Sequence, residues 1–190
     1  MSIVIIDSGG ANLTSIKNAF EKISSQAVVS IDENIISNAD YVILPGVGSA
    51  QMVMQSLISN NLVNVIKSLT QPVLGICVGM QILFNSSEEQ NCKCLGLIND
   101  DIKKFNLPKD KAVPHMGWNK VIFESEQLLS NYYYFANSYY APITKDTTGI
   151  CEYGIEFSAT VQKDNFFGCQ FHPEKSSNSG IKFIQNFLKY

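Results

Sequence analysis

The first 84 residues alternate short apolar runs with longer amphipathic stretches, and this alternation constrains the fold more than any other feature. Residues 12–24 and 49–69 carry apolar side chains at helical spacing, the second stretch with an interruption near Asn60 and Asn61. Strands that are apolar on both faces and alternate with helices are typical of a mostly parallel sheet flanked by helices. The runs that predict such strands are 3–7, 27–31, 41–45 and 72–76. We therefore expect an α/β fold with functional residues on the loops that follow the strands.

After about residue 92 the chain changes to short segments rich in aromatic and β-branched residues. Such segments predict additional antiparallel strands, which either extend the main sheet or form a small second one. These segments are 120–123, 132–141, 149–154, 157–162 and 166–171. A last helix is expected over 179–188. Because the 190 residues are 45% hydrophobic and contain no linker, we expect a single domain, 1–190.

The composition excludes several classes of function. A net charge of −3 provides no basic field for nucleic acid or an anionic membrane surface. The first apolar run is too short for a signal peptide, and no stretch has the length of a membrane span. Five cysteines, an odd number, favour free thiols in a reducing cytoplasm. Cys92 and Cys94 have no histidine near them, so no metal site is expected.

Cys77 stands between two glycines where the run 72–76 meets a helical stretch. The pattern Gly75-x-Cys77-x-Gly79 has the form of a nucleophile elbow, in which small residues allow a sharp turn. A helix amino terminus would favour the thiolate, and the N–H of Val78 would point toward an oxyanion. A small buried core cysteine beside turn glycines is the alternative. The pentapeptide alone leaves these two interpretations balanced.

A thiolate nucleophile needs a base, and the chain has two histidines. His172 follows a predicted strand in the motif FHPEK, where Pro173 favours an extended backbone. Residues i and i+2 of an extended chain share a side, so Glu174 can orient the imidazole; an ordinary surface turn is the alternative. His115, in PHMGWN, has no carboxylate near it in sequence and is predicted to be a binding residue. The residues thus favour a Cys77–His172–Glu174 arrangement.

A glycine-containing loop, LPGVGSA at 44–50, follows another predicted strand. Gly46 and Gly48 allow a backbone amide to turn toward a neighbouring site, although a turn that only starts the next helix is the more common role. A parallel sheet would bring this loop beside the elbow, which favours a role in the site.

Taken in order, LPGVG, GICVGMQ and FHPEK resemble the class I glutamine amidotransferases of the triad type. PHMGWN narrows the resemblance to the glutaminase subunits of imidazole glycerol phosphate synthase. DSGGANLTSIKNAF and SATVQKDNFFGCQFHPEKS extend it over the whole chain. The resemblance implies a flavodoxin-like fold and no cofactor.

It also implies a reaction. Cys77 would attack the side-chain amide of L-glutamine, and His172, held by Glu174, would pass a proton to the departing ammonia. Hydrolysis of the γ-glutamyl thioester would then release glutamate. The oxyanion would be held by amides of Val78 and of the segment Gly46, Val47 and Gly48. The positions that match glutamine-binding residues are Gln81, Glu89, Ser138 and Tyr139.

The implied partner is a (β/α)8 cyclase subunit, which would form a heterodimer with this chain and receive the ammonia through a tunnel. The cyclase would form imidazole glycerol phosphate and an aminoimidazole carboxamide ribonucleotide in histidine biosynthesis. Trp118, expected on a loop, is a candidate anchor for docking, with burial in the core as the alternative. The positions that match the docking face are His115, Met116, Trp118, Asn119, Tyr134 and Lys175.

One position departs from the family pattern. Asn137 stands in FANSY where the family commonly has histidine, and asparagine does not titrate near neutral pH. Two other functions stay open. One is an enzyme that serves another synthase or acts alone as a thiol hydrolase, and the other is a catalytically silent regulatory subunit. Only Asn137 supports the silent subunit.

Overall fold

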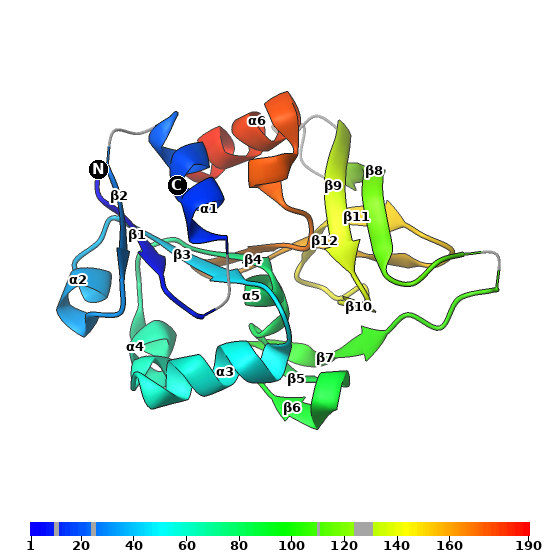
Figure 1. The fold of residues 1–190 in the computed structure, drawn as a ribbon, viewed down its shortest axis with the longest axis horizontal. Helices are drawn as coiled ribbons and strands as arrows, with labels where there is room; N and C mark the ends of the chain where they lie inside the picture. Colours follow the sequence, from blue (N-terminus) through cyan, green and yellow to red (C-terminus); the bar gives the residue numbers. More distant parts are fainter. Residues whose placement is uncertain (10–11, 24–25, 110, 124–130) are drawn as a thin grey trace.

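The computed structural model describes residues 1–9, 12–23, 26–109, 111–123 and 131–190 (Figure 1). Its centre is a nine-stranded sheet with the order β2-β1-β3-β4-β13-β12-β11-β8-β9 within the described residues. The first five strands in this order run parallel to one another. They are β1 (Ile3–Ile6), β2 (Ala27–Ser30), β3 (Tyr41–Gly46), β4 (Val73–Cys77) and β13 (Phe166–Cys169). The order 2-1-3-4 followed by one further parallel strand is that of the flavodoxin-like fold, which confirms the predicted fold class.

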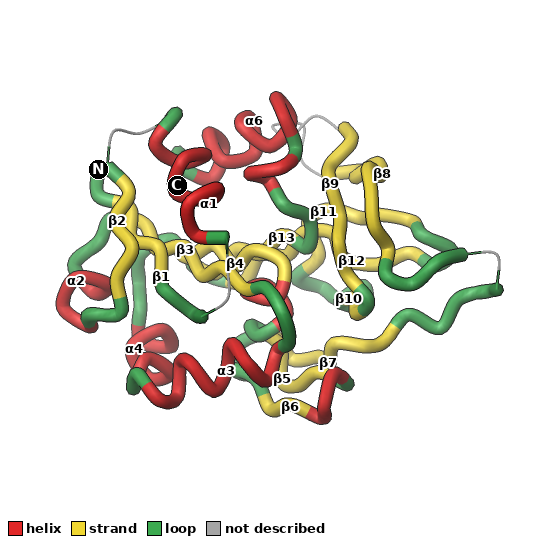
Figure 2. Tube along the Cα trace, in the orientation of Figure 1, coloured by secondary structure: helices red, strands yellow, loops and turns green. Residues whose placement is uncertain are grey.

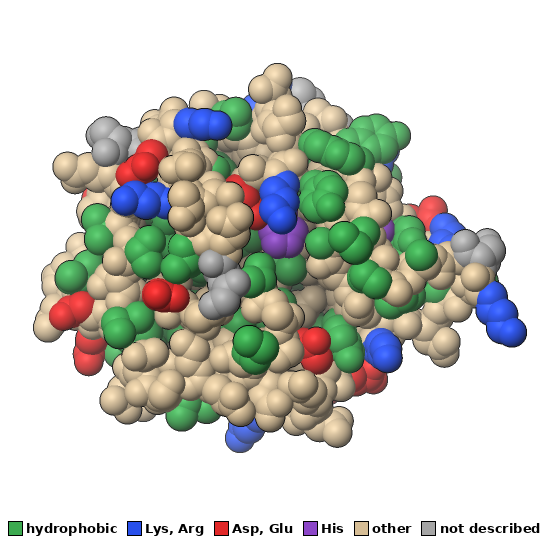
Figure 3. All heavy atoms as spheres, in the orientation of Figure 1, with side chains coloured by type: hydrophobic (Ala, Val, Ile, Leu, Met, Phe, Trp, Pro, Cys, Tyr) green, Lys and Arg blue, Asp and Glu red, His purple; other side chains and the backbone are tan. Residues whose placement is uncertain are grey.

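The remaining four strands extend the sheet in the antiparallel sense. They are β12 (Glu156–Lys163), β11 (Thr147–Glu152), β8 (His115–Phe123) and β9 (Asn131–Asn137). A second sheet of four short strands lies below the main one, near the start of α3 (Figure 2). It consists of β10 (Tyr139–Tyr140), β7 (Ile98–Lys104), β5 (Phe84–Ser87) and β6 (Cys92–Lys93). Of the predicted later segments, only 132–141 contributes to the second sheet, through β10. The segment 166–171 was expected to be antiparallel, but its strand β13 runs parallel to β4. On the face shown in Figure 3, hydrophobic side chains gather over β8 and β9.

Helices cover both faces of the main sheet. In Figure 1, α1 (Leu13–Glu21) and α6 (Ser177–Phe187) lie on one side, whereas α3 (Ala50–Ser59) and α4 (Leu62–Ser68) lie on the other. Asn61, with a left-handed backbone (φ 58°), separates α3 from α4 at the predicted interruption. The short helical segments are α2 (Glu33–Ser37), α5 (Val78–Gln81), η1 (Glu89–Asn91) and η2 (Pro173–Lys175). No helix among the described residues combines the length and the apolar character needed to cross a membrane.

The structure differs from the sequence-based expectation in several elements. The predicted helix over 12–24 ends earlier, at Glu21, and residue 24 itself lies outside the described residues. The short helix α2 and the strands β5, β6 and β7 were not predicted. β7 was not recognisable in the sequence because only Ile98 and Ile102 of its seven residues have a buried side chain. The predicted strand over 132–141 is broken at Ser138, where the chain leaves the main sheet for the second one.

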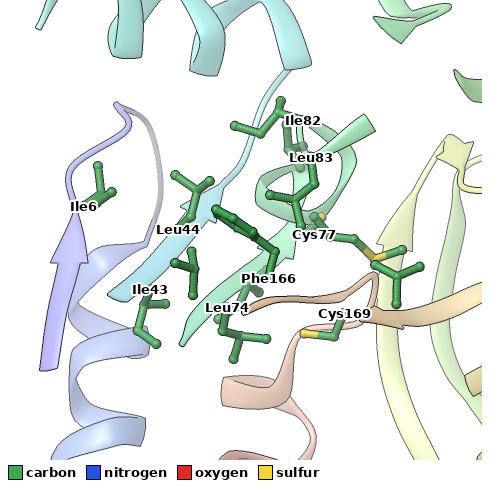
Figure 4. Packing of buried hydrophobic residues seen from close by; sticks show 14 of the residues in the cluster. Ile6, Ile43, Leu44, Leu74, Cys77, Ile82, Leu83, Phe166 and Cys169 are labelled. Atoms are coloured by element: carbon green, nitrogen blue, oxygen red, sulfur yellow. The ribbon is translucent and has the colours of Figure 1, made fainter. Parts of the chain in front are cut away.

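The core explains why the early strands are apolar on both faces. Neighbouring side chains along a strand point to opposite faces of the sheet. Figure 4 shows Leu44 and Phe166 on the face that carries α5, and Ile43 and Leu74 on the opposite face. Both sets are buried, since helices cover both faces. Because α5 begins at Val78, this packing fixes the carboxyl end of β4, where Cys77 lies.

Candidate active site

Cys77 is the last residue of β4 and directly precedes α5. Its backbone has a positive φ of 56°, a conformation that costs about 1–3 kcal/mol in a residue with a Cβ and that is typical of strained nucleophiles. The two flanking glycines are required by close backbone packing. A Cβ at Gly75 would lie 2.6 Å from the carbonyl oxygen of Gly79, and a Cβ at Gly79 would overlap the carbonyl oxygen of Leu44. The predicted elbow is therefore the geometry that the structure shows.

We expect Gly79→Ala to destabilise the protein by about 3 kcal/mol, because the new methyl group meets backbone atoms of β3 that cannot rotate away. In a chain of this size this lowers Tm by roughly 10 °C. Thermal unfolding followed by circular dichroism measures the change. Gly117→Ala is the comparison variant: the φ of 130° at Gly117 strains an alanine, but open space surrounds the added Cβ, so we expect a smaller loss there. Equal losses in both variants would contradict the assigned clash.

His172 and Glu174 form a buried pair at the turn after β13. The Nδ1 atom of His172 lies 2.8 Å from Oε1 of Glu174, and the two side chains are 6% and 3% exposed. Burial alone would lower the pKa of His172, but hydrogen bonds and charge interactions with Cys77 and Glu174 outweigh it and raise this pKa to about 10. A pKa of about 10 keeps the imidazole positively charged at neutral pH, with Cys77 and Glu174 both in hydrogen-bond contact with it. The structure brings the three predicted triad residues together.

The histidine is also held by the edge strand β9. The backbone N–H of His172 donates to the carbonyl oxygen of Tyr134 over 2.8 Å. The hydroxyl of Ser176 donates to the carbonyl oxygen of His172 and accepts from the N–H of Tyr134, at 2.7 and 3.0 Å. β9, which carries the predicted docking residue Tyr134, thus fixes the position of the predicted base.

A pocket of about 250 Å³ opens beside Cys77. All four predicted glutamine-binding residues line it. Glu89 is anchored there because its Oε2 accepts a hydrogen bond from the N–H of Ala50, at the start of α3. The full lining consists of Gly48, Cys77, Val78, Gln81, Glu89, Pro114, Ala136, Asn137, Ser138 and Tyr139.

The segment predicted to hold the oxyanion lies next to the elbow. Gly46, the last residue of β3, pairs in register with Cys77, and Val47 follows it. Gly48 has a φ of 87° and lines the pocket together with Val78. The two segments whose amides were predicted to share the oxyanion therefore flank the Cys77 side chain.

Most of the predicted docking residues form an exposed patch on β8, β9 and η2. Met116 and Trp118 are 64% and 52% exposed. Trp118 packs edge-on against Tyr134, and the ammonium group of Lys175 lies 5.9 Å from the centre of the Tyr134 ring. Asn119 is half-buried and donates to the carbonyl oxygen of Glu152. Trp118 lies on a strand and not on a loop as predicted, and its exposure removes the alternative that it fills the core.

His115 does not belong to this patch. Its imidazole is buried, stacked between Tyr153 and Phe135 at 3.9 and 4.8 Å between ring centres. Burial, with a smaller contribution from Lys111, lowers its pKa to about 4, so the ring is neutral. The expectation that His115 offers a contact on the docking face is corrected accordingly. His115 was expected in an exposed loop, whereas it is the first residue of β8 and its side chain faces the core.

Asn137 lies in the wall of the pocket with a buried side chain. Its Nδ2 donates to the carbonyl oxygen of Tyr139 over 2.9 Å, and its Oδ1 has no hydrogen-bond partner among the described residues. The departure from the family pattern therefore concerns the pocket wall and leaves the contacts between His172 and Glu174 in place.

Gln170, a buried polar residue beside Cys77, was not predicted from the sequence. Its Nε2 lies 3.8 Å from Sγ of Cys77, and its Oε1 accepts a hydrogen bond from Gln81. The available signal was a glutamine in the otherwise apolar run FFGCQF. The five cysteines are free, and the described residues hold no group of three or more side chains suited to a metal.

Comparison with known proteins agrees with this geometry. Residues 4–190 match the family described as Glutamine amidotransferase class-I. Imidazole glycerol phosphate synthase subunit HisH of Shewanella sediminis is 46% identical over 197 residues, covering 98% of this chain and 90% of that protein. The subunit of the same name from Escherichia coli K12 is 45% identical over 199 residues and is covered completely, as is this chain.

Solved structures share the fold at lower identity. The crystal structure of a glutamine amidotransferase has a TM-score of 0.78 at 13% identity, with coverage of 98% of this chain and 97% of that one. PurLQS from Thermotoga maritima has a TM-score of 0.72 at 17% identity, with coverage of 100% and 98%. From the family match over nearly the whole chain, the elbow geometry and the full-length relatives, the chain belongs to the class-I glutamine amidotransferase family.

Proposed function

We propose that this protein, as one domain of residues 1–190, is the glutaminase subunit of an imidazole glycerol phosphate synthase and hydrolyses L-glutamine to glutamate and ammonia. The observation that carries the proposal is that Cys77, in contact with the His172–Glu174 pair, lines a pocket together with Gln81 and Glu89. The HisH relatives, at 45–46% identity over the full chain, support the choice of synthase.

The chemistry follows from the charges of the triad. Cys77 attacks the side-chain amide carbon of glutamine as a thiolate, and the negative oxygen that forms lies near the N–H of Val78 at the start of α5. His172 gives its proton to the departing nitrogen, which leaves as ammonia. The neutral imidazole then takes a proton from the water that hydrolyses the thioester. Glu174 stabilises the imidazolium and holds Nε2 toward Cys77.

The proposed partner is a (β/α)8 cyclase subunit that forms a heterodimer with this chain and uses the ammonia to make imidazole glycerol phosphate in histidine biosynthesis. The names of the relatives and the exposed patch of Met116, Trp118, Tyr134 and Lys175 support this partner. The backbone hydrogen bond from His172 to Tyr134, and the link between them through the Ser176 hydroxyl, offer a direct route by which docking affects the base. Free thiols at all five cysteines agree with a cytoplasmic location.

The test is a glutaminase assay on the purified chain, alone, with the cyclase, and with the cyclase and its ribonucleotide substrate. We expect strong stimulation when partner and ribonucleotide are both present. Robust hydrolysis by the chain alone, unchanged by the cyclase, would favour a free-standing hydrolase. Absence of hydrolysis under all three conditions would favour a silent subunit.

We expect Trp118→Ala to weaken binding of the cyclase by about 30-fold, because a half-exposed tryptophan at the centre of the patch is a typical interface anchor. Isothermal titration of the cyclase into the variant measures the change in Kd. Ile122→Ala is the matched control, since Ile122 is 59% exposed on the same side of β8 but four residues further along the strand. Equal weakening by both substitutions, or by neither, would contradict the assigned patch.

A further inference from the structure

The amide of Gln170 joins the nucleophile to the wall of the pocket. Gln170 directly follows β13 and is fully buried. Its Oε1 lies 2.8 Å from Nε2 of Gln81, and its Nε2 lies 3.8 Å from Sγ of Cys77. One side chain therefore contacts both the predicted nucleophile and a residue that lines the pocket.

The polarity of this chain of amides is set by a backbone carbonyl. Nε2 of Gln81 lies 3.1 Å from the carbonyl oxygen of Tyr139, which can only accept a hydrogen bond. Gln81 must therefore present its NH2 group on this side, where it donates its second hydrogen to Gln170. It follows that Gln170 turns its oxygen to Gln81 and its NH2 group to Cys77. Neither amide can flip without placing two acceptors or two donors against each other.

This arrangement leaves two groups ready for the reaction. Both hydrogens of the Gln81 amide are used inside the protein, and its Oε1 accepts no hydrogen bond among the described residues. That oxygen is free to accept an N–H of a ligand in the pocket. On the other side, the Gln170 N–H faces sulfur, and a thiolate accepts a hydrogen bond more strongly than a thiol does.

We propose that Gln170 is a positioning residue for glutamine hydrolysis, which aims the Gln81 amide oxygen at an N–H group of the bound amino acid and donates a hydrogen bond to the Cys77 thiolate. The proposal rests on the glutaminase function proposed above and assigns part of it to a residue outside the triad. Gln170 acts through Cys77 and Gln81 and does not line the pocket itself.

The test uses Gln170→Met in the complex with the cyclase. Methionine keeps the length of the side chain and removes both hydrogen bonds. We expect KM for glutamine to rise about 10-fold and kcat to fall about 10-fold, each from the loss of one buried hydrogen bond. The rate at which iodoacetate alkylates Cys77, read by peptide mass spectrometry, should also fall about 10-fold, because the Cys77 thiolate loses its hydrogen bond from Gln170. Iodoacetate has no N–H group that the Gln81 oxygen could accept, so this rate reports on Cys77 alone. Gln162→Met, on β12 and remote from Cys77, is the matched control and should change none of these values.

A double-mutant cycle separates positioning from a general loss of structure. In a Gln81→Met background, Gln170→Met should hardly raise KM further, yet it should still slow alkylation of Cys77. Additive effects on KM, or an unchanged alkylation rate, would overturn the proposal. If the wild-type complex hydrolyses glutamine and the Gln170→Met variant has the same KM, kcat and alkylation rate, this inference alone is overturned. Wild-type complex without glutaminase activity would instead overturn the proposed function.

Discussion

Replacing Cys77 by alanine is expected to abolish glutamine hydrolysis, with kcat falling on the order of 10⁴-fold or more. The other cysteines cannot substitute for it. Burial raises the pKa of Cys151 to about 12 and that of Cys169 well above its usual value, so both thiols stay protonated at neutral pH. Alanine has the same backbone restrictions as cysteine at φ 56°, so the elbow and the docking patch should persist.

Ammonia release and binding of the cyclase are measured on the same preparation. We expect the first to vanish and the second to be unchanged. Cys151→Ala, which removes a buried thiol on β11, is the control and should retain hydrolysis. Glutaminase activity that survives in Cys77→Ala would refute the thiolate mechanism.

Glu174→Gln is expected to lower kcat by about 100-fold, because the carboxylate that stabilises the His172 imidazolium is replaced by a neutral amide. It should also change the pH dependence. In the native protein the pKa of His172 is raised to about 10, so the imidazolium and its transferable proton persist through neutral pH and are lost as the pH rises through that value. Removal of the negative charge lowers this pKa. The alkaline decline of activity should therefore begin at a lower pH in the variant.

The measurement is kcat for glutamine hydrolysis by the complex between pH 6 and pH 10.5, with each variant checked for an intact fold by circular dichroism. Glu156→Gln, an exposed carboxylate at the start of β12, is the control and should leave the alkaline limit unmoved. An alkaline limit that is the same in Glu174→Gln and in the native protein would show that Glu174 does not set the charge of His172.

The position of Cys77 could be predicted because its determinants are local. An apolar run, a glycine on each side at two residues' distance and a helical stretch specify a turn by backbone sterics alone. The pairing of His172 with Glu174 is local too, since Pro173 restricts the backbone between them. That these two turns meet was inferred from the need of a thiolate for a base in a chain with two histidines. They lie together because β13 inserts next to β4 and runs parallel to it, although the segment 166–171 was expected to be antiparallel.

His115 shows where local patterns fail. PHMGWN contains glycine and polar residues and reads as a loop, yet β8 begins at His115 because it pairs with β9, where Asn137 lies opposite. That pairing turns the His115 side chain toward the aromatic core and leaves Trp118 on the outside. The second sheet was not predicted because β5, β6 and β7 have few buried positions, so their sequences lack the apolar pattern of a strand.

The sequence by itself determined the first four parallel strands, the elbow, the choice of Cys77, His172 and Glu174 as a candidate triad, and four of the residues that line the pocket. These depend on backbone sterics, on hydrophobic periodicity and on a resemblance that spans the chain. Tertiary structure alone decided the burial of His115, the break at Ser138 and the hydrogen bonds from Gln170 to Cys77 and Gln81. Each of these depends on contacts between segments that lie far apart in the chain. The local sequence around one residue does not indicate which distant residue it will contact.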